Sequence, residues 1–143
     1  KDVRIRFLGD RSLFPASVAP ICQQVEDATR NCSTLNVSLL FCYGGQQEIA
    51  HATQKIAHDV KEGKIDISDI DSALVGRYLW THDLPEPEIV IRPGNRQRLS
   101  NFMLFQSAYS ELFFLEHLWP DVTPEIIRQV LDEFKQRKRN FGA

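Results

Sequence analysis

The sequence predicts an α/β fold, with a largely parallel sheet flanked by helices. Short apolar runs alternate along the chain with segments whose apolar residues recur at helical spacing. Each apolar run ends at a glycine or a proline, namely Gly9, Gly44 and Pro93. The predicted order is strand, helix, strand, helix, strand, helix, helix, and this alternation favours parallel strands joined by right-handed crossovers.

The first half of the chain supplies two of the predicted strands. Residues Val3–Leu8 alternate apolar side chains with arginines, which is typical of a strand. A helix is expected over Ile21–Arg30, followed by a second, buried strand over Leu35–Tyr43. Helical spacing then runs over Gln46–Glu62, and Gly63 stands where a glycine commonly ends a helix.

The second half is predicted to hold a short helix that the order above does not count, followed by one strand and two further helices. Ser68 can cap a short helix that runs to Leu74, and Glu88–Arg92 forms the third strand. The following loop leads into a helix near Ser100. Thr123 can then cap the final helix, whose C-terminal end carries the basic residues between Lys135 and Arg139.

Composition narrows the classes of function. The 143 residues are 43% hydrophobic and 25% charged, which suits one globular domain. The formal net charge of -2 argues against a surface that binds polyanions, so no nucleic-acid partner is expected. The three cysteines (Cys22, Cys32 and Cys42) lack the spacing of a zinc site, and buried, reduced thiols in a cytoplasmic protein are expected.

The segment after the third strand carries the strongest chemical signal. It begins with Arg92 and continues through Gly94, Arg98 and Ser100 into a predicted helix start. Ligands of open α/β sheets bind at the carboxyl ends of strands, and clustered guanidiniums suit phosphate groups. The alternative is a surface turn with solvated arginines in which Ser100 only caps the helix.

Several motifs, in order, resemble the cis-prenyltransferases, the family of undecaprenyl diphosphate synthase. The resemblance spans essentially the whole chain. The matching segments are Arg6–Asp10, Leu35–Glu48 with its Tyr43-Gly44-Gly45, Arg92–Gln106, Tyr109–Leu112, Leu118–Asp121 and Arg139–Gly142.

The resemblance implies a role for four residues. Arg92, Arg98 and Ser100 match the residues that hold the diphosphate of isopentenyl diphosphate, and Glu111 matches a glutamate that binds Mg²⁺ near that diphosphate. A hard cation beside guanidiniums would neutralise a diphosphate. The alternatives for Glu111 are a solvated carboxylate or the partner of an arginine.

Four positions depart from the family pattern. Pro93, Asn95 and Arg96 change the loop after the third strand, and Gln46 replaces an arginine. Asn tolerates the left-handed backbone better than most residues, so Asn95 can stand where the family has glycine. These changes leave substrate specificity open, and a synthase of short or branched products is an alternative.

Five aromatic side chains invite a second interpretation. They are spaced as on a helix and could line a prenyl tunnel, but core or dimer-interface positions are the more common outcome. The five are Phe102, Phe105, Tyr109, Phe113 and Phe114.

We therefore expect residues 1–143 to form a single domain, the C-terminal part of a cis-prenyltransferase that lacks the family's N-terminal loop for the allylic diphosphate. The implied reaction condenses isopentenyl diphosphate with an allylic diphosphate such as farnesyl diphosphate, with Mg²⁺ as cofactor, in a homodimer. The expected location is cytoplasmic, with peripheral membrane association through the product left open. The rival hypotheses are a non-catalytic partner subunit and an unrelated phosphate-binding module.

Overall fold

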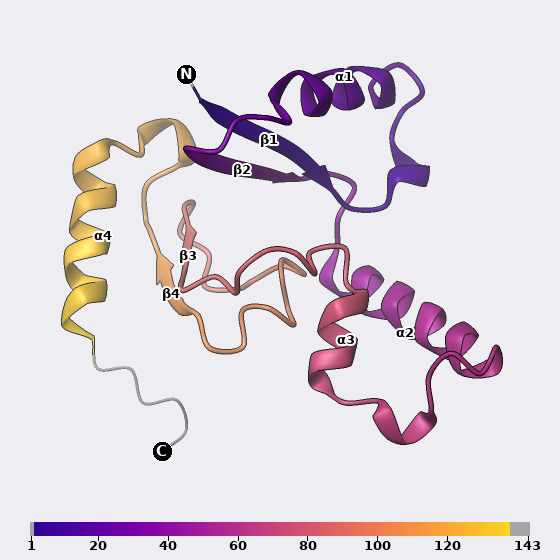
Figure 1. The fold of residues 1–143 in the computed structure, drawn as a ribbon. Coiled ribbons are helices and arrows are strands. Elements are labelled where there is room, and N and C mark those ends of the chain that lie inside the picture. Colours follow the sequence, from indigo (N-terminus) through magenta and orange to yellow (C-terminus); the bar gives the residue numbers. More distant parts are fainter. Residues whose placement is uncertain (1, 138–143) are drawn as a thin grey trace. The chain divides into compact units, whose positions relative to one another are not determined.

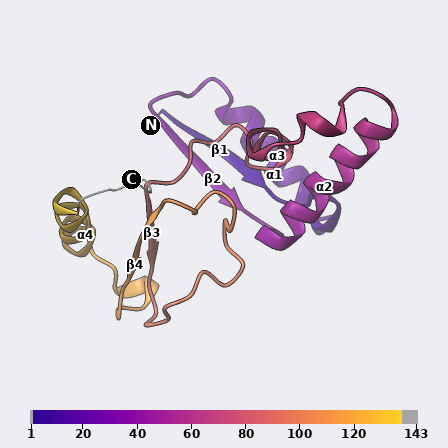
Figure 2. The same cartoon turned by 90° about the horizontal axis from the view of Figure 1, so that it is seen from below.

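A computed structural model describes residues 2–137, which divide into two compact units with the boundary in the sequence after Leu84. Each unit is built around a pair of parallel strands (Figures 1 and 2). The α/β class and the parallel pairing were therefore predicted correctly. The family's closing motif, Arg139–Gly142, lies outside the described residues.

In the first unit, β1 (Val3–Leu8) pairs in parallel with β2 (Leu35–Leu40). Helix α1 (Ala19–Thr29) lies along β1 and closes its other edge. The backbone N–H of Phe7 donates to the carboxylate of Glu26 at 2.8 Å, and that of Ile5 donates to the Thr29 hydroxyl at 3.1 Å. Side chains of α1 thus satisfy backbone groups that would otherwise lack a strand partner.

Gly9 stops β1 for a steric reason. Its φ is +141°, and a Cβ atom placed there would lie 2.1 Å from the carbonyl oxygen of Phe41. The backbones after the two strands therefore approach so closely that only glycine fits. The Asp10 N–H donates to the Cys42 carbonyl at 3.2 Å and secures this approach.

Helix α2 (Gly45–Lys61) packs beside α3 (Ser72–Tyr78). Gly63 has a φ of +71°, as its predicted place after the helix end requires. The capping prediction at Ser68 was wrong. Asp66 caps a short 3-10 turn (Ile67–Asp69) and Asp71 caps α3, because carboxylates accept the free N–H groups there.

A buried carboxylate joins the end of β2 to the segment after α3. Glu48 is 0% exposed. It accepts hydrogen bonds from the Tyr43 hydroxyl at 2.6 Å, the Thr81 hydroxyl at 2.8 Å and the Thr81 N–H at 3.0 Å. Glu48, the last residue of the family-like segment Leu35–Glu48, thus holds the start of α2 to the segment after α3.

The second unit holds β3 (Ile89–Arg92) in parallel with β4 (Glu111–Phe114), followed by a 3-10 turn (Trp119–Asp121) and α4 (Pro124–Gln136). The Thr123 hydroxyl accepts from the Ile126 N–H at 3.4 Å, so the predicted cap of the last helix is confirmed.

The predicted helix near Ser100 does not form. Consecutive turns replace it, with left-handed φ values at Ser100 (+49°), Asn101 (+66°) and Met103 (+44°) that an α-helix excludes. The strand β4 was also missed. Phe113 and Phe114 therefore point to opposite faces of a strand and do not share one helical stripe.

The expectation of buried cysteines holds only in part. All three are free, and Cys22 is buried in α1, but Cys32 and Cys42 are partly exposed because they follow the ends of α1 and β2 in loops.

Candidate diphosphate site

Two arginines and a serine come together where β3 ends. Arg92 Nη1 donates to the Ser100 hydroxyl at 2.8 Å and also to the backbone carbonyl of Arg98. The Nε of Arg98 donates to the same hydroxyl at 3.2 Å. The structure therefore brings together three of the four residues that the sequence singled out, and we call them the arginine cradle.

The loop backbone explains how this cluster forms. Gly94 has a φ of +98° and Asn95 a φ of +52°, so the prediction that Asn95 takes the left-handed conformation is confirmed. The Gly94 N–H donates to the His117 carbonyl at 2.7 Å, and the Asn95 N–H donates to the Leu115 carbonyl at 2.8 Å. These bonds tie the loop to the segment after β4 and turn the chain back toward Arg92.

The electrostatics of the arginine cradle favour an anion. Within residues 2–137, neither Arg92 nor Arg98 forms an ion pair with a carboxylate. Two guanidiniums thus converge on one hydroxyl without a counter-charge. Such a cluster can offer several charge-assisted hydrogen bonds to phosphate oxygens.

A small apolar cavity adjoins the arginine cradle. Its volume is about 250 Å³. Phe102, which is 41% exposed, and Leu99 line it together with Arg92 and Arg98. An anion held by the guanidiniums would therefore have an apolar surface beside it. The full lining is Val90, Ile91, Arg92, Pro93, Arg98, Leu99 and Phe102.

Glu111 lies apart from the arginine cradle. The register pairs Glu111 with Ile89, at the start of the strands, and Arg92 with Phe114, at their end. The two positions are three residues apart along the strands, or roughly 10 Å, and side chains an odd number of positions apart point to opposite faces. The sequence predicts Glu111 near the residues that bind the diphosphate. Within one chain, however, the strand register places Glu111 at the opposite end of the strand pair from Arg92 and on its opposite face.

The Glu111 carboxylate has an arginine partner. Arg137 Nη1 donates to it at 2.7 Å, Arg137 Nη2 donates to Glu133 at 2.6 Å, and the guanidinium lies 4.0 Å from the Phe113 ring centroid. Hydrogen bonding to Glu111, more than any other cause, raises the pKa of Arg137. The arginine partner that the sequence left open for Glu111 is present, and a role in metal binding stays a prediction.

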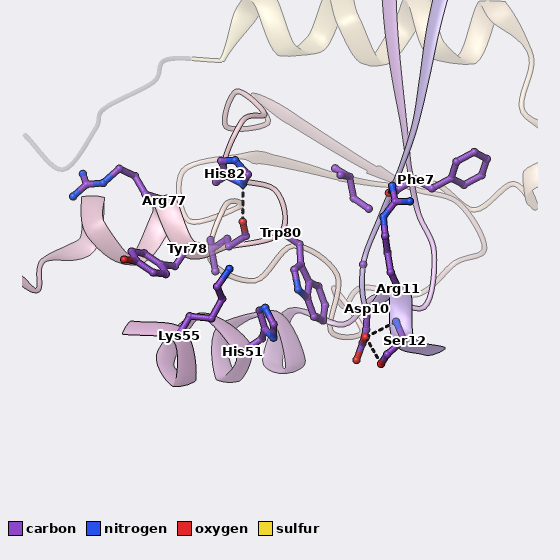
Figure 3. A pocket seen from close by; sticks show the side chains of 13 residues that line it. Phe7, Asp10, Arg11, Ser12, His51, Lys55, Arg77, Tyr78, Trp80 and His82 are labelled. Atoms are coloured by element: carbon purple, nitrogen blue, oxygen red, sulfur yellow. Dashed lines mark hydrogen bonds between the residues drawn. The ribbon is translucent and has the colours of Figure 1, made fainter. Parts of the chain in front are cut away.

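The first unit holds a second, larger cavity of about 620 Å³ where β1 ends (Figure 3). His51 and Lys55 reach its wall from α2, and the His51 ring lies 5.5 Å from that of Trp80. Asp10 faces it too, and hydrogen bonds from the Ser12 hydroxyl and N–H lower the Asp10 pKa. Its lining comes from three separated segments, so no local motif could have revealed it.

The described part of the chain, residues 2–137, contains no helix with both the length and the apolar character needed to cross a bilayer.

The parallel strands place the protein in the α/β class, and its cationic loop lies at a strand end, where α/β proteins commonly bind ligands. The family profile described as "Putative undecaprenyl diphosphate synthase" matches residues 1–142. The chain therefore belongs to the undecaprenyl diphosphate synthase family of prenyltransferases.

Curated relatives support this assignment. A tritrans,polycis-undecaprenyl-diphosphate synthase (geranylgeranyl-diphosphate specific) of Thermococcus kodakarensis is 41% identical over 140 residues, which are 98% of this chain and 53% of the relative. An isoprenyl transferase of Bacillus subtilis is 42% identical over 144 residues, covering 100% of this chain and 55% of that protein. The chain thus spans about half the length of these relatives.

A solved structure agrees over nearly the whole chain. Lavandulyl diphosphate synthase from Lavandula x intermedia, solved in complex with dimethylallyl diphosphate, matches with a TM-score of 0.95 and 31% sequence identity. The match covers 99% of this chain and 61% of the plant enzyme.

Proposed function

We propose that this chain carries the isopentenyl-diphosphate half-site of a cis-prenyltransferase that elongates prenyl chains. The observation that carries the proposal is the convergence of Arg92 and Arg98 on the Ser100 hydroxyl, without a carboxylate partner in the described residues. Family membership and the names of the sequence relatives support chain elongation.

The proposed reaction joins C4 of isopentenyl diphosphate to C1 of an allylic diphosphate such as farnesyl diphosphate. The allylic carbon–oxygen bond breaks, the allylic diphosphate leaves, and a proton is lost from C2 of isopentenyl diphosphate as the new Z double bond forms. The arginine cradle would bind the diphosphate of isopentenyl diphosphate through its guanidiniums. Its contribution is positioning and charge stabilisation, with no covalent intermediate on the protein.

The apolar cavity beside the arginine cradle supports this substrate. Leu99 and Phe102 offer a surface to the five-carbon group while Arg92 and Arg98 hold the phosphates. Because the diphosphate is fixed at one end, the bound substrate would present its reactive end in a restricted set of orientations.

Mg²⁺ is proposed as the cofactor, with Glu111 as its ligand in this chain. The donor chemistry fits, since Mg²⁺ binds through one or two carboxylates together with phosphates and waters, and the Glu111 carboxylate already holds a cationic group. When bound, Mg²⁺ would supply positive charge to a diphosphate. The strand register separates Glu111 from Arg92, so we assign the two residues to separate parts of the site.

The allylic diphosphate as second substrate and the homodimer belong to the whole protein and are proposed on the same basis. A non-catalytic partner subunit is the weaker hypothesis, because it has no need for a cluster of arginines free of carboxylates. A synthase of short or branched products would use the same half-site and is separated from chain elongation by product analysis.

The test joins these 143 residues to the part of the Bacillus subtilis isoprenyl transferase that they do not match. Labelled isopentenyl diphosphate is supplied with farnesyl diphosphate and Mg²⁺. Long labelled products would support the proposal, and their loss with Arg98→Ala but not Arg96→Ala would locate the half-site. Binding of isopentenyl diphosphate without any product would favour the non-catalytic subunit.

A further inference from the structure

We propose that Glu111 and Glu133 form one cation site, that the guanidinium of Arg137 occupies it in the metal-free protein, and that Mg²⁺ binds there by displacing Arg137. This inference rests on the proposed role of Glu111 and adds to it a second carboxylate and a resident competitor.

The contacts of Arg137 define the site. Its Nη1 lies 2.7 Å from Glu111 on β4, and its Nη2 lies 2.6 Å from Glu133 on α4. Two carboxylates from different elements are therefore gathered on one guanidinium. Without a cation between them they would repel each other, so the position they surround favours positive charge.

The two carboxylates suit a small hard cation. The side chain of Glu111 is 25% exposed and is fixed by its strand, whereas that of Glu133 is 59% exposed and can shift. Mg²⁺ commonly takes one or two protein carboxylates and completes its coordination with waters and phosphate oxygens. Departure of the guanidinium would let the Glu133 carboxylate move toward Glu111.

Arg137 also fastens the end of α4. Its guanidinium lies 4.0 Å from the centroid of the Phe113 ring on β4, and its backbone N–H donates to the Phe134 carbonyl at 3.1 Å. Displacement of the guanidinium removes its contacts with Glu111 and Phe113 on β4, whereas the backbone hydrogen bond to Phe134 does not depend on the side chain. Metal binding would thus be coupled to loss of the side-chain contacts between the end of α4 and β4.

Competition lowers the apparent affinity for the metal, because Mg²⁺ must first displace Arg137. Two partly exposed ion pairs and one ring contact make this cost moderate. We expect Arg137→Gln to lower the apparent dissociation constant for a divalent cation by roughly three- to thirty-fold. Arg128→Gln is the matched control, because Arg128 lies on the same helix and pairs with Glu125 at 2.7 Å.

The experiment titrates the 143-residue chain with Mn²⁺, followed by the electron paramagnetic resonance signal of free Mn²⁺, and displaces it with Mg²⁺. Tighter binding in Arg137→Gln than in the wild type and Arg128→Gln supports the proposal. Loss of that gain when Glu133→Gln is added supports the second carboxylate. Circular dichroism verifies folding, and Arg137→Lys, which keeps the charge, should bind at an intermediate strength.

Separate results identify which proposal fails. Binding that needs Glu111 but is equal with and without Arg137 overturns the competition and leaves Glu111 as a metal ligand. Failure of both the wild type and Arg137→Gln to bind Mn²⁺ overturns the metal role of Glu111 and this inference with it. As a second measurement on the wild type, the guanidinium resonance of Arg137 should shift on Mg²⁺ addition, and an unchanged resonance at saturation contradicts displacement.

Discussion

Arg92 donates a hydrogen bond to the hydroxyl of Ser100 at 2.8 Å, so the end of β3 is joined to a turn eight residues further along the chain. Ser100 has a left-handed backbone, which directs its side chain back toward the strand end. The guanidiniums are thus oriented before any ligand arrives, and preorganisation of this kind reduces the entropy lost on binding.

Replacing Arg98 tests the arginine cradle directly. Arg98→Ala should weaken binding of isopentenyl diphosphate by about 1.5–3 kcal/mol, the range of a hydrogen bond to a charged group. The measurement is isothermal titration calorimetry on the 143-residue chain. Arg96→Ala is the control, because Arg96 is an exposed residue of the same loop that lies outside the lining of the apolar cavity. Equal losses of binding affinity in both variants would mean that the general positive charge of the surface, and not the arginine cradle, binds the ligand.

Gly9→Ala should destabilise the first unit strongly. The new methyl group would lie 2.1 Å from the Phe41 carbonyl oxygen. The backbone φ of +141° is also one that residues with a side chain rarely adopt. We expect a loss of about 2–4 kcal/mol in the free energy of unfolding, measured by urea denaturation.

Gly63→Ala separates the steric effect from the backbone effect. Gly63 also has a positive φ, +71°, but a Cβ atom there meets nothing within 4 Å. Its cost should be about 1 kcal/mol, the penalty of a left-handed residue alone. Similar losses at the two glycines would rule out the close approach of the backbones as the cause.

The sequence predicted those parts of the fold that depend on local patterns. The strand Val3–Leu8, the cap at Thr123 and the left-handed Asn95 follow from alternation, capping chemistry and backbone preference. The turns around Ser100 could not be predicted from local patterns. The apolar residues there have helical spacing, but the hydrogen bonds that tie Gly94 and Asn95 to the segment after β4 prevent a helix.

The same distinction applies to the candidate site, where a local motif determines one part and a long-range strand pairing determines the other. Arg92, Arg98 and Ser100 lie within nine residues of one another, so the motif itself brings them together. Glu111 depends on a strand pairing that the sequence did not reveal, and its partner Arg137 is 26 residues away. The register, and not the motif, decides which face of the strand pair Glu111 occupies.

Glu48→Ala should be the most destabilising change at a carboxylate of the first unit. Removal of this buried side chain deprives the Tyr43 hydroxyl and both Thr81 donors of an acceptor. Each donor that loses its acceptor costs about 1–3 kcal/mol, so we expect a loss of about 3–5 kcal/mol in the free energy of unfolding, again measured by urea denaturation. Glu62→Ala, at an exposed ion pair with Lys64, should change stability by less than about 1 kcal/mol. A small effect of Glu48→Ala would mean that water replaces the carboxylate.

Asp2 should make stability depend on acid pH. Its carboxylate accepts hydrogen bonds from the Thr34 hydroxyl and from the backbone N–H groups of Thr34 and Ser33, and the Thr34 hydroxyl is the main reason that the pKa of Asp2 is lowered to about 2. Since the folded pKa lies below the unfolded value near 3.8, the unfolded state binds more protons in between. The contribution is therefore complete above pH 4 and is lost as the pH falls toward 2.

Urea unfolding of the wild type and Asp2→Asn at pH 6, 4, 3 and 2 should show two stability curves that converge as the pH falls. Thr34→Val should move the loss to higher pH, because it removes the main hydrogen bond that favours the charged carboxylate. Curves for the wild type and Asp2→Asn that stay parallel across this range would show that Asp2 titrates alike in the folded and unfolded chains.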